Sequence, residues 1–185
     1  MKFNNKENEQ LTLADGRVIW LARSSTVVVT VWCFVGNTPY LLLGKRGEGC
    51  PDQIGKWNLP CGYLDWNETL TEAAYREVFE ETGVNIRDIN KHSILLAYID
   101  QPWKVSSNHY SDNFASKQNI SHHYAMVFSA DKLPKLSMDY CELDEVSELH
   151  WAPMESLNSY DYAFNHKQLI SLFLSRVEVR PLFGD

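Results

Sequence analysis

Three glutamates between Gly62 and Val84 are spaced to share one face of a helix. Glu77 and Glu81 are four residues apart, so at about 3.6 residues per helical turn they lie one above the other, with Glu80 beside them. Like charges at this separation repel and require a counter-charge. A divalent cation such as Mg²⁺, which prefers oxygen ligands and substrate phosphates, is suited to that role. The spacing therefore predicts a metal site that handles phosphates.

The surrounding residues occur at fixed offsets from these glutamates. The segment resembles the signature of the Nudix hydrolases, G-x5-E-x7-R-E-U-x-E-E-x-G-U, in which U is aliphatic. The alternative explanation, a solvated acidic helix face, requires no such offsets. Seven matches by chance have a probability on the order of 10⁻⁸ per starting position. The matching residues are Gly62, Glu68, Arg76, Glu77, Glu80, Glu81 and Gly83, and both U positions, Val78 and Val84, are valine.

The Nudix resemblance implies a ligand set for the metal. It implies that Glu77, Glu80 and Glu81 bind the metal or organise the attacking water. A backbone carbonyl near the first glycine, which corresponds here to Cys61 or Gly62, joins the coordination. The expected cofactor is Mg²⁺, with Mn²⁺ as a substitute.

Other residues of the motif have expected supporting roles. Arg76 can orient a carboxylate through a bidentate contact and is counted with the catalytic residues Glu77 and Glu80. Glu68 is expected to support the site, although stabilisation of the first helical turn explains it equally well. The lead-in Trp57-Asn-Leu-Pro-Cys61-Gly resembles the family pattern W-x-L-P-G-G with a cysteine in place of a glycine. We therefore expect a slightly altered carbonyl geometry there.

The catalytic base is predicted to come from outside the motif. Many Nudix hydrolases use a glutamate from a downstream loop, and several acids precede the strand expected near Trp151. Glu145 is the first choice and Glu142 the second, while Glu148 is a third acid in the same segment. The alternative is a solvated acidic loop.

Substrate contacts are less clearly encoded. Arg46 matches a family position that often contacts substrate phosphate, and a surface arginine is the alternative. The segment 98–106 partly resembles an element of NADH pyrophosphatases, which favours a nucleotide sugar, ADP-ribose or a dinucleotide. Trp103, Tyr110 and Phe114 could stack on a base, although such aromatic residues more often pack against the protein itself.

Hydrophobic patterns predict the elements that position these residues. Thr26–Val35 is β-branched and nearly continuous, which predicts a strand buried on both faces. Thr69 and Glu72 form a capping-box pattern and Gly83 occupies the expected C-terminal position, so the helix of the motif lies between them. Further strands are predicted over residues 40–46, 93–99, 123–130 and 148–151, a helical turn over 154–157 and a helix over 164–177.

This mixture of strands and two substantial helices predicts an α/β fold. The Nudix resemblance implies an α/β/α sandwich with a mixed β-sheet. Asp15-Gly16 between two apolar stretches predicts a β-hairpin added at the N-terminus. We therefore expect an N-terminal hairpin extension over residues 1–25 and a single Nudix hydrolase domain over residues 26–180. The hairpin's apolar surface is the basis for an expected homodimer.

Composition limits the class of partner. The chain has 185 residues, 44% of them hydrophobic, and a formal net charge of −7 with a pI near 5.3. This charge offers no broad basic face for a nucleic acid polymer or an anionic membrane. No apolar run is long enough to span a bilayer, so a cytoplasmic location is expected. The four cysteines lack C-x-x-C spacing, which favours reduced, structural thiols.

Taken together, these features predict a divalent-metal-dependent pyrophosphohydrolase. The favoured substrate is a nucleoside diphosphate linked to another group, such as ADP-ribose, a nucleotide sugar or a dinucleotide. A (d)NTP pyrophosphatase that sanitises the nucleotide pool is one alternative. A non-catalytic ligand sensor with the same fold is the other.

Overall fold

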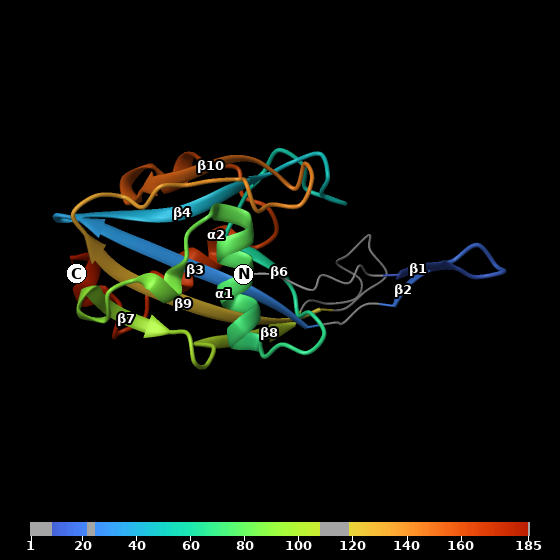
Figure 1. Cartoon of the computed structure of the whole chain (residues 1–185), viewed down its shortest axis with the longest axis horizontal. Coiled ribbons are helices and arrows are strands. Elements are labelled where there is room, and N and C mark those ends of the chain that lie inside the picture. Colours follow the sequence, from blue (N-terminus) through green and yellow to red (C-terminus); the bar gives the residue numbers. More distant parts are fainter. Residues whose placement is uncertain (1–8, 22–24, 108–118, 185) are drawn as a thin grey trace.

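The computed structural model describes residues 9–21, 25–107 and 119–184 (Figure 1). Within these residues, eight strands form one sheet, whose main path runs in the order β10-β4-β3-β9-β7. Short strands β5, β6 and β8 pair with β4, β3 and β9, respectively. The strands of this sheet are β3 (Ser25–Val35), β4 (Thr38–Arg46), β5 (Trp57–Asn58), β6 (Cys61–Tyr63), β7 (Ile94–Tyr98), β8 (Lys104–Ser107), β9 (Ile120–Ala130) and β10 (Val146–Pro153).

Helical segments connect and cover these strands. The α-helices are α1 (Leu70–Thr82), α2 (His166–Leu174) and α3 (Arg180–Phe183). Short 3₁₀ helices are η1 (Ile86–Asp88), η2 (Lys91–Ser93) and η4 (Met154–Ser159). No helix among the described residues is long and apolar enough to cross a membrane.

The sheet is mixed, as predicted. β3 and β9 run parallel along their whole length, from the pair Ser25 and Ile120 to the pair Val35 and Ala130. β4 and β6 pair antiparallel with β3, while β7 and β8 pair antiparallel with β9. A parallel pair needs a long crossover, and here that crossover contains α1 and the outer strand β7.

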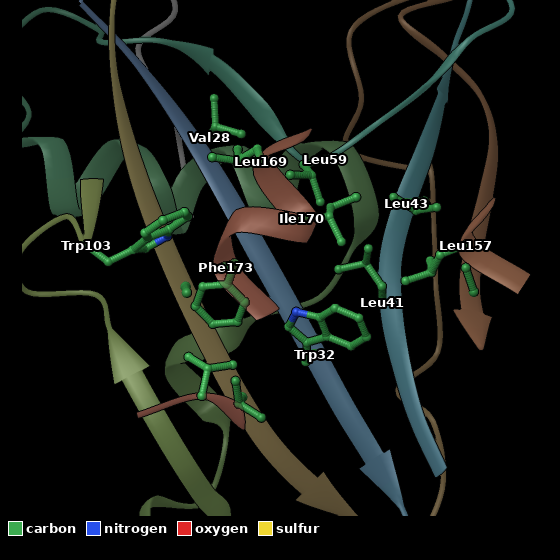
Figure 2. Close-up of a cluster of buried hydrophobic side chains, with 14 of the residues drawn as sticks. Val28, Trp32, Leu41, Leu43, Leu59, Trp103, Leu157, Leu169, Ile170 and Phe173 are labelled. Carbon is green, nitrogen blue, oxygen red and sulfur yellow. The ribbon is translucent and has the colours of Figure 1, made fainter. Parts of the chain in front are cut away.

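Buried β3 contributes side chains to both faces of the sheet. Its alternate residues Val27, Val29 and Val31 belong to a cluster with Ala73, Ala74 and Val78 of α1. Val28, Trp32 and Phe34 point to the other face and belong to a cluster with Leu169, Ile170 and Phe173 of α2. Figure 2 shows this second cluster around Trp32 and Phe173. Helices on both faces of a mixed sheet confirm the predicted α/β/α sandwich.

Helix α1 is held at both ends. The Thr69 hydroxyl accepts a hydrogen bond from the Glu72 backbone N–H at 3.2 Å, and the Glu72 carboxylate accepts one from the Thr69 N–H at 2.8 Å. Gly83 ends the helix with a left-handed φ of 73° and donates its N–H to the Phe79 carbonyl. The predicted capping box and glycine terminus are both confirmed.

The predicted hairpin is also present. Strands β1 (Glu9–Thr12) and β2 (Val18–Leu21) pair antiparallel across the turn that contains Gly16, whose φ is 82°. In Figure 1 this hairpin lies beyond one end of the main sheet. The division of the chain into residues 1–25 and 26–180 remains a prediction, as does a homodimer.

Sequence reasoning placed most of the other elements correctly. The predicted strands over 40–46, 93–99, 123–130 and 148–151 correspond to β4, β7, β9 and β10, and the predicted helix over 164–177 contains α2. Strand β8 was not predicted, because its sequence Lys-Val-Ser-Ser offers only one apolar residue. It forms by pairing with β9, from Lys104 opposite His123 to Ser107 opposite Ile120.

Replacing Thr69 with alanine is expected to lower the free energy of unfolding by about 1 kcal/mol, because the Glu72 backbone N–H loses the hydroxyl oxygen that accepts its hydrogen bond. Thr69→Ser keeps the hydroxyl and is the matched control. Urea unfolding of both variants measures the difference. Equal stability of the two variants would contradict a role for the cap.

Candidate active site

Helix α1 presents its glutamates to strand β6 rather than to open solvent. Glu77 and Glu81 are only 7% and 3% exposed. The Glu81 Oε1 atom accepts a hydrogen bond from the Cys61 backbone N–H at 3.2 Å. A Cβ atom at Gly62 would collide with the Glu77 carboxylate, so the glycine leaves the space that this carboxylate occupies.

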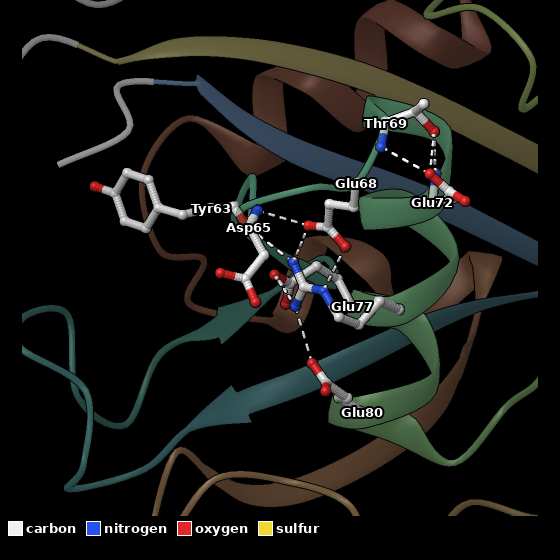
Figure 3. A network of polar contacts seen from close by, with 8 residues as sticks. Tyr63, Asp65, Glu68, Thr69, Glu72, Glu77 and Glu80 are labelled. Carbon is white, nitrogen blue, oxygen red and sulfur yellow. Dashed lines mark hydrogen bonds and ion pairs between the residues drawn. The ribbon is translucent and has the colours of Figure 1, made fainter. Parts of the chain in front are cut away.

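Arg76 is the centre of a polar network that joins α1 to the loop preceding it, and Figure 3 shows its partners Tyr63, Glu68, Glu77 and Glu80. Its Nη1 atom donates to Glu77 Oε1 at 2.8 Å and to Glu80 Oε2 at 2.9 Å. Its Nε and Nη2 atoms donate to both oxygens of Glu68, at 3.0 and 2.8 Å, and Nη2 also reaches the Tyr63 carbonyl at 2.9 Å. One buried guanidinium therefore binds three of the predicted carboxylates, as expected for an orienting residue.

Two backbone groups complete this network. Besides the Tyr63 carbonyl, the Asp65 N–H donates to Glu68 Oε1 at 2.6 Å. Glu68 thus ties the loop before α1 to Arg76 as well as lying near the helix start. Sequence reasoning missed both groups, because a backbone contact leaves no signature in the residue type.

Burial makes these carboxylates hard to ionise. It raises the pKa of Glu77 to about 8, against the lowering effect of the Arg76 guanidinium. It also raises the pKa of Glu81 well above the usual value, and the neighbouring charges of Glu77 and Glu145 raise it further. The Glu81 Oε2 atom is buried and has no hydrogen-bond partner. At least one buried carboxylate oxygen of the site therefore has no hydrogen-bond donor.

A buried carboxylate oxygen without a donor is suited to bind a divalent cation. Among the described residues, no three acidic, histidine or cysteine side chains are already gathered as a complete ligand set, and Arg76 contacts Glu77 and Glu80. Mg²⁺, however, is usually held by one or two carboxylates together with waters and substrate phosphates. Glu77 and Glu81, with the unpartnered Oε2 atom, offer hard oxygen donors of this kind.

The three downstream acids occupy different environments. Glu145 is half-buried, and its charge contributes to the raised pKa values of Glu77 and Glu81. Glu142 is exposed and contributes to the raised pKa of Glu80. Glu148 is exposed and pairs with Lys45 at 3.4 Å. The structure thus brings Glu145 to the glutamates of α1 and leaves Glu148 outside.

A family model described as the NUDIX domain matches residues 24–173, most of the chain. The chain belongs to the Nudix family. This match confirms the family that was predicted from the sequence.

Curated Nudix relatives match parts of the chain. A putative mutator protein MutT4 of Mycobacterium tuberculosis is 32% identical over 115 residues, which are 60% of this chain and 39% of the relative. Phosphatase NudJ of Escherichia coli (strain K12) is 59% identical over 58 residues, which are 31% of this chain and 35% of NudJ. The chain spans less than two thirds of the length of these relatives.

Solved Nudix structures share the fold. The NUDIX domain of Shewanella oneidensis NrtR, complexed with ADP ribose, has a TM-score of 0.62 and 20% identity, covering 86% of this chain and 88% of that one. A bifunctional NMN adenylyltransferase/ADP ribose pyrophosphatase of Francisella tularensis, complexed with AMP and a Mn ion, has a TM-score of 0.61 and 24% identity. The match covers 81% of this chain and 40% of the Francisella chain.

Arg46 of this Nudix domain lies near the carboxylates but already has partners. Its Nη2 atom pairs with Asp52 Oδ1 at 3.0 Å, and its guanidinium lies 4.9 Å from the centre of the Phe164 ring. The charge of Arg46 counteracts the burial that raises the pKa of Glu145. A phosphate contact by Arg46 would have to compete with Asp52.

The structure corrects the prediction for Trp103. This side chain is 9% exposed and belongs to the core cluster beneath α2, whereas α1 carries the glutamates on the opposite face. Its ring lies 5.3 Å from that of Phe173, and its indole N–H donates to the Tyr124 carbonyl at 3.3 Å. A ring packed in this way has no free face for a substrate base. Tyr110 and Phe114 lie outside the described residues.

The cysteine in place of the family glycine is accommodated without strain. Cys61 lies in β6, where it pairs with Val28, and its Sγ atom accepts a hydrogen bond from Asn58 Nδ2 at 3.5 Å. Burial raises the pKa of this thiol well above its usual value, which makes it a poor nucleophile. All four cysteines are free, as predicted.

The raised pKa of Glu77 predicts a pH-dependent stability of the metal-free protein. The folded protein retains a proton that the unfolded chain releases, so the stabilisation is full below about 4.5 and is lost as the pH rises through about 8. The melting temperature in EDTA should therefore fall between pH 5.5 and 8.5. Glu77→Gln should flatten this fall, and an unchanged slope would contradict the assignment.

Proposed function

We propose that this chain is a divalent-metal-dependent pyrophosphohydrolase that uses Mg²⁺, with Mn²⁺ as a substitute. The observation that carries the proposal is the buried pair Glu77 and Glu81, in which Glu77 is bound by the Arg76 guanidinium and Glu81 leaves its Oε2 atom without a hydrogen-bond partner. A fold without this chemistry would gain nothing from burying two adjacent carboxylates, because each loses hydration.

Each residue then has a defined role in hydrolysis. Glu77, Glu80 and Glu81, with a backbone carbonyl of Cys61 or Gly62, would hold the metal, which supplies charge neutralisation for the phosphoryl groups. Arg76 fixes the orientation of Glu77 and Glu80 through its hydrogen bonds.

Glu145 takes the proton of the attacking water. Burial raises the pKa of Glu145 above its usual value, which makes its carboxylate a stronger base than an exposed one. Of the other acids in this segment, Glu142 is exposed and Glu148 is paired with Lys45. We therefore keep Glu145 as the base.

For the substrate, we favour a nucleoside diphosphate linked to another group. This choice is supported by similar folds, one of which was solved with ADP ribose and another of which belongs to a bifunctional NMN adenylyltransferase/ADP ribose pyrophosphatase. Arg46, whose charge acts on Glu145, is proposed to meet a substrate phosphate once it leaves Asp52. A (d)NTP pyrophosphatase and a non-catalytic ligand sensor are the other outcomes of the test.

The test is product release from a panel of ADP-ribose, NADH, nucleotide sugars, diadenosine polyphosphates and (d)NTPs, with Mg²⁺, Mn²⁺ or EDTA. We expect metal-dependent turnover of one class and a loss of at least about 100-fold in Glu80→Gln and Glu81→Gln, because each removes a group that organises charge at the reacting phosphate. Glu155→Gln, at an exposed acid of η4, is the control. Tight binding without turnover would indicate a sensor.

Replacing Glu145 with glutamine should lower kcat by about 10²- to 10⁴-fold, the usual contribution of a general base, with little change in melting temperature. Glu148→Gln is the matched control, since Glu148 pairs with Lys45 at the surface and should be dispensable. The measurement is steady-state kinetics on the best substrate of the panel. A near wild-type rate in Glu145→Gln would remove Glu145 from the mechanism.

A further inference from the structure

A short glycine-containing turn after β4, residues 47–50, forms hydrogen bonds to the backbone carbonyls of Asp144 and Glu145. We call this set of hydrogen bonds the grip. The Gly47 N–H donates to the Glu145 carbonyl at 2.8 Å, and the Gly49 N–H donates to the Asp144 carbonyl at 2.8 Å. The Cys50 thiol donates to the same Glu145 carbonyl at 3.2 Å. Three donors from one turn therefore fix two consecutive carbonyls in a segment remote in sequence.

The contact is too close for any side chain at the two glycines. A Cβ atom at Gly47 would collide with the Asp144 carbonyl oxygen, and one at Gly49 would lie 2.5 Å from the Leu143 carbonyl oxygen. Both obstacles are backbone atoms, which cannot rotate away as a flexible side chain can. A larger residue would therefore move the segment that carries Glu145.

The gripped segment is itself strained. Asp144 has a φ of 57°, a left-handed conformation that is unfavourable for a residue with a Cβ atom. The pairing of β10 with β4 also shifts register between Val146 and Glu148, immediately after Glu145. Between a left-handed residue on one side and an irregular pairing on the other, the turn restrains this backbone together with the hydrogen bond from the Glu145 N–H to the Glu142 carbonyl.

We infer that Gly47, Gly49 and Cys50 are positioning residues that set the Glu145 carboxylate against the glutamates of α1. This inference rests on the proposed function, in which Glu145 is the base. None of the three touches the reacting atoms. Their effect passes through the Asp144–Glu145 backbone.

The pKa values of neighbouring groups agree with a position of Glu145 close to α1. The charge of Glu145 raises the pKa values of both Glu77 and Glu81. It also raises the pKa of Cys141, whose thiol donates to the carbonyls of Glu80 and Glu81 at 3.2 Å. Glu145 therefore lies close enough to α1 for its charge to act on Glu77 and Glu81.

The test compares Gly47→Ala with Gly44→Ala. A Cβ atom at Gly44 meets only ordinary van der Waals contacts, the nearest at 3.6 Å, so this variant controls for the loss of a glycine in the same stretch of chain. We expect Gly47→Ala to lower kcat by roughly 100-fold, because a shift of about 1 Å in a catalytic group can have that effect, with KM within about twofold. Gly44→Ala should keep both constants.

A double variant separates positioning from general damage. If Gly47→Ala acts through Glu145, then adding it to Glu145→Gln should cause no further loss of kcat. Losses that multiply, or a KM that rises together with the fall in kcat, would overturn the inference. Circular dichroism and melting curves identify variants that fail to fold.

Cys50 provides a second variant that adds no bulk. Cys50→Ala removes one donor to the Glu145 carbonyl, whereas Cys50→Ser keeps a hydroxyl donor. We expect kcat to fall in Cys50→Ala and to be restored in Cys50→Ser, and equal rates in the two would count against the grip. If Glu145→Gln is itself nearly as active as wild type, the base assignment fails. If Glu145→Gln is inactive while Gly47→Ala is normal, only the positioning inference fails.

Discussion

The interaction on which the rest of the structure depends is the contact of Arg76 with three carboxylates at the junction of α1 and β6. Two glutamates of α1, Glu77 and Glu81, are almost entirely removed from water, and their like charges oppose this burial. Arg76 offsets part of that cost through bonds to Glu77, Glu80 and Glu68. It can do so only because α1 packs directly on the strand.

Several unrelated features serve this close packing. Gly62 leaves room for the Glu77 carboxylate, and β6 is held in place by its pairing with β3, opposite Val27. The same β3 supplies the valines on which Ala73 and Ala74 of α1 rest. The small alanines lower the helix onto the sheet and thereby bring its glutamates to the backbone of β6. The packing of the hydrophobic core therefore also sets the position of the polar site.

Sequence reasoning succeeded where the determinants are local. The capping residues, the apolar face of α1 and the spacing of its glutamates are all encoded within one short segment, so the helix and its acidic face could be predicted together. It failed for Trp103, because an aromatic residue beside a polar stretch has the same pattern whether it packs under α2 or meets a ligand. The pairing of Arg46 with Asp52 and the grip on Glu145 join segments whose proximity is set by the sheet. No spacing rule reveals such contacts.

Charge balance links the site to its expected cation. Two cations, Arg76 and Arg46, act on five acids of the site, which are Glu68, Glu77, Glu80, Glu81 and Glu145. Without a metal, the protein relieves the excess by keeping a proton on Glu77, whose pKa is raised to about 8. A divalent cation would have to displace that proton, since carboxylates bind metals in the ionised form. Proton and metal therefore compete for the same oxygens, and the affinity for the metal should increase with pH. The same exchange prepares the site for phosphates, because an anionic substrate is repelled by uncompensated carboxylates and attracted once the cation outweighs them.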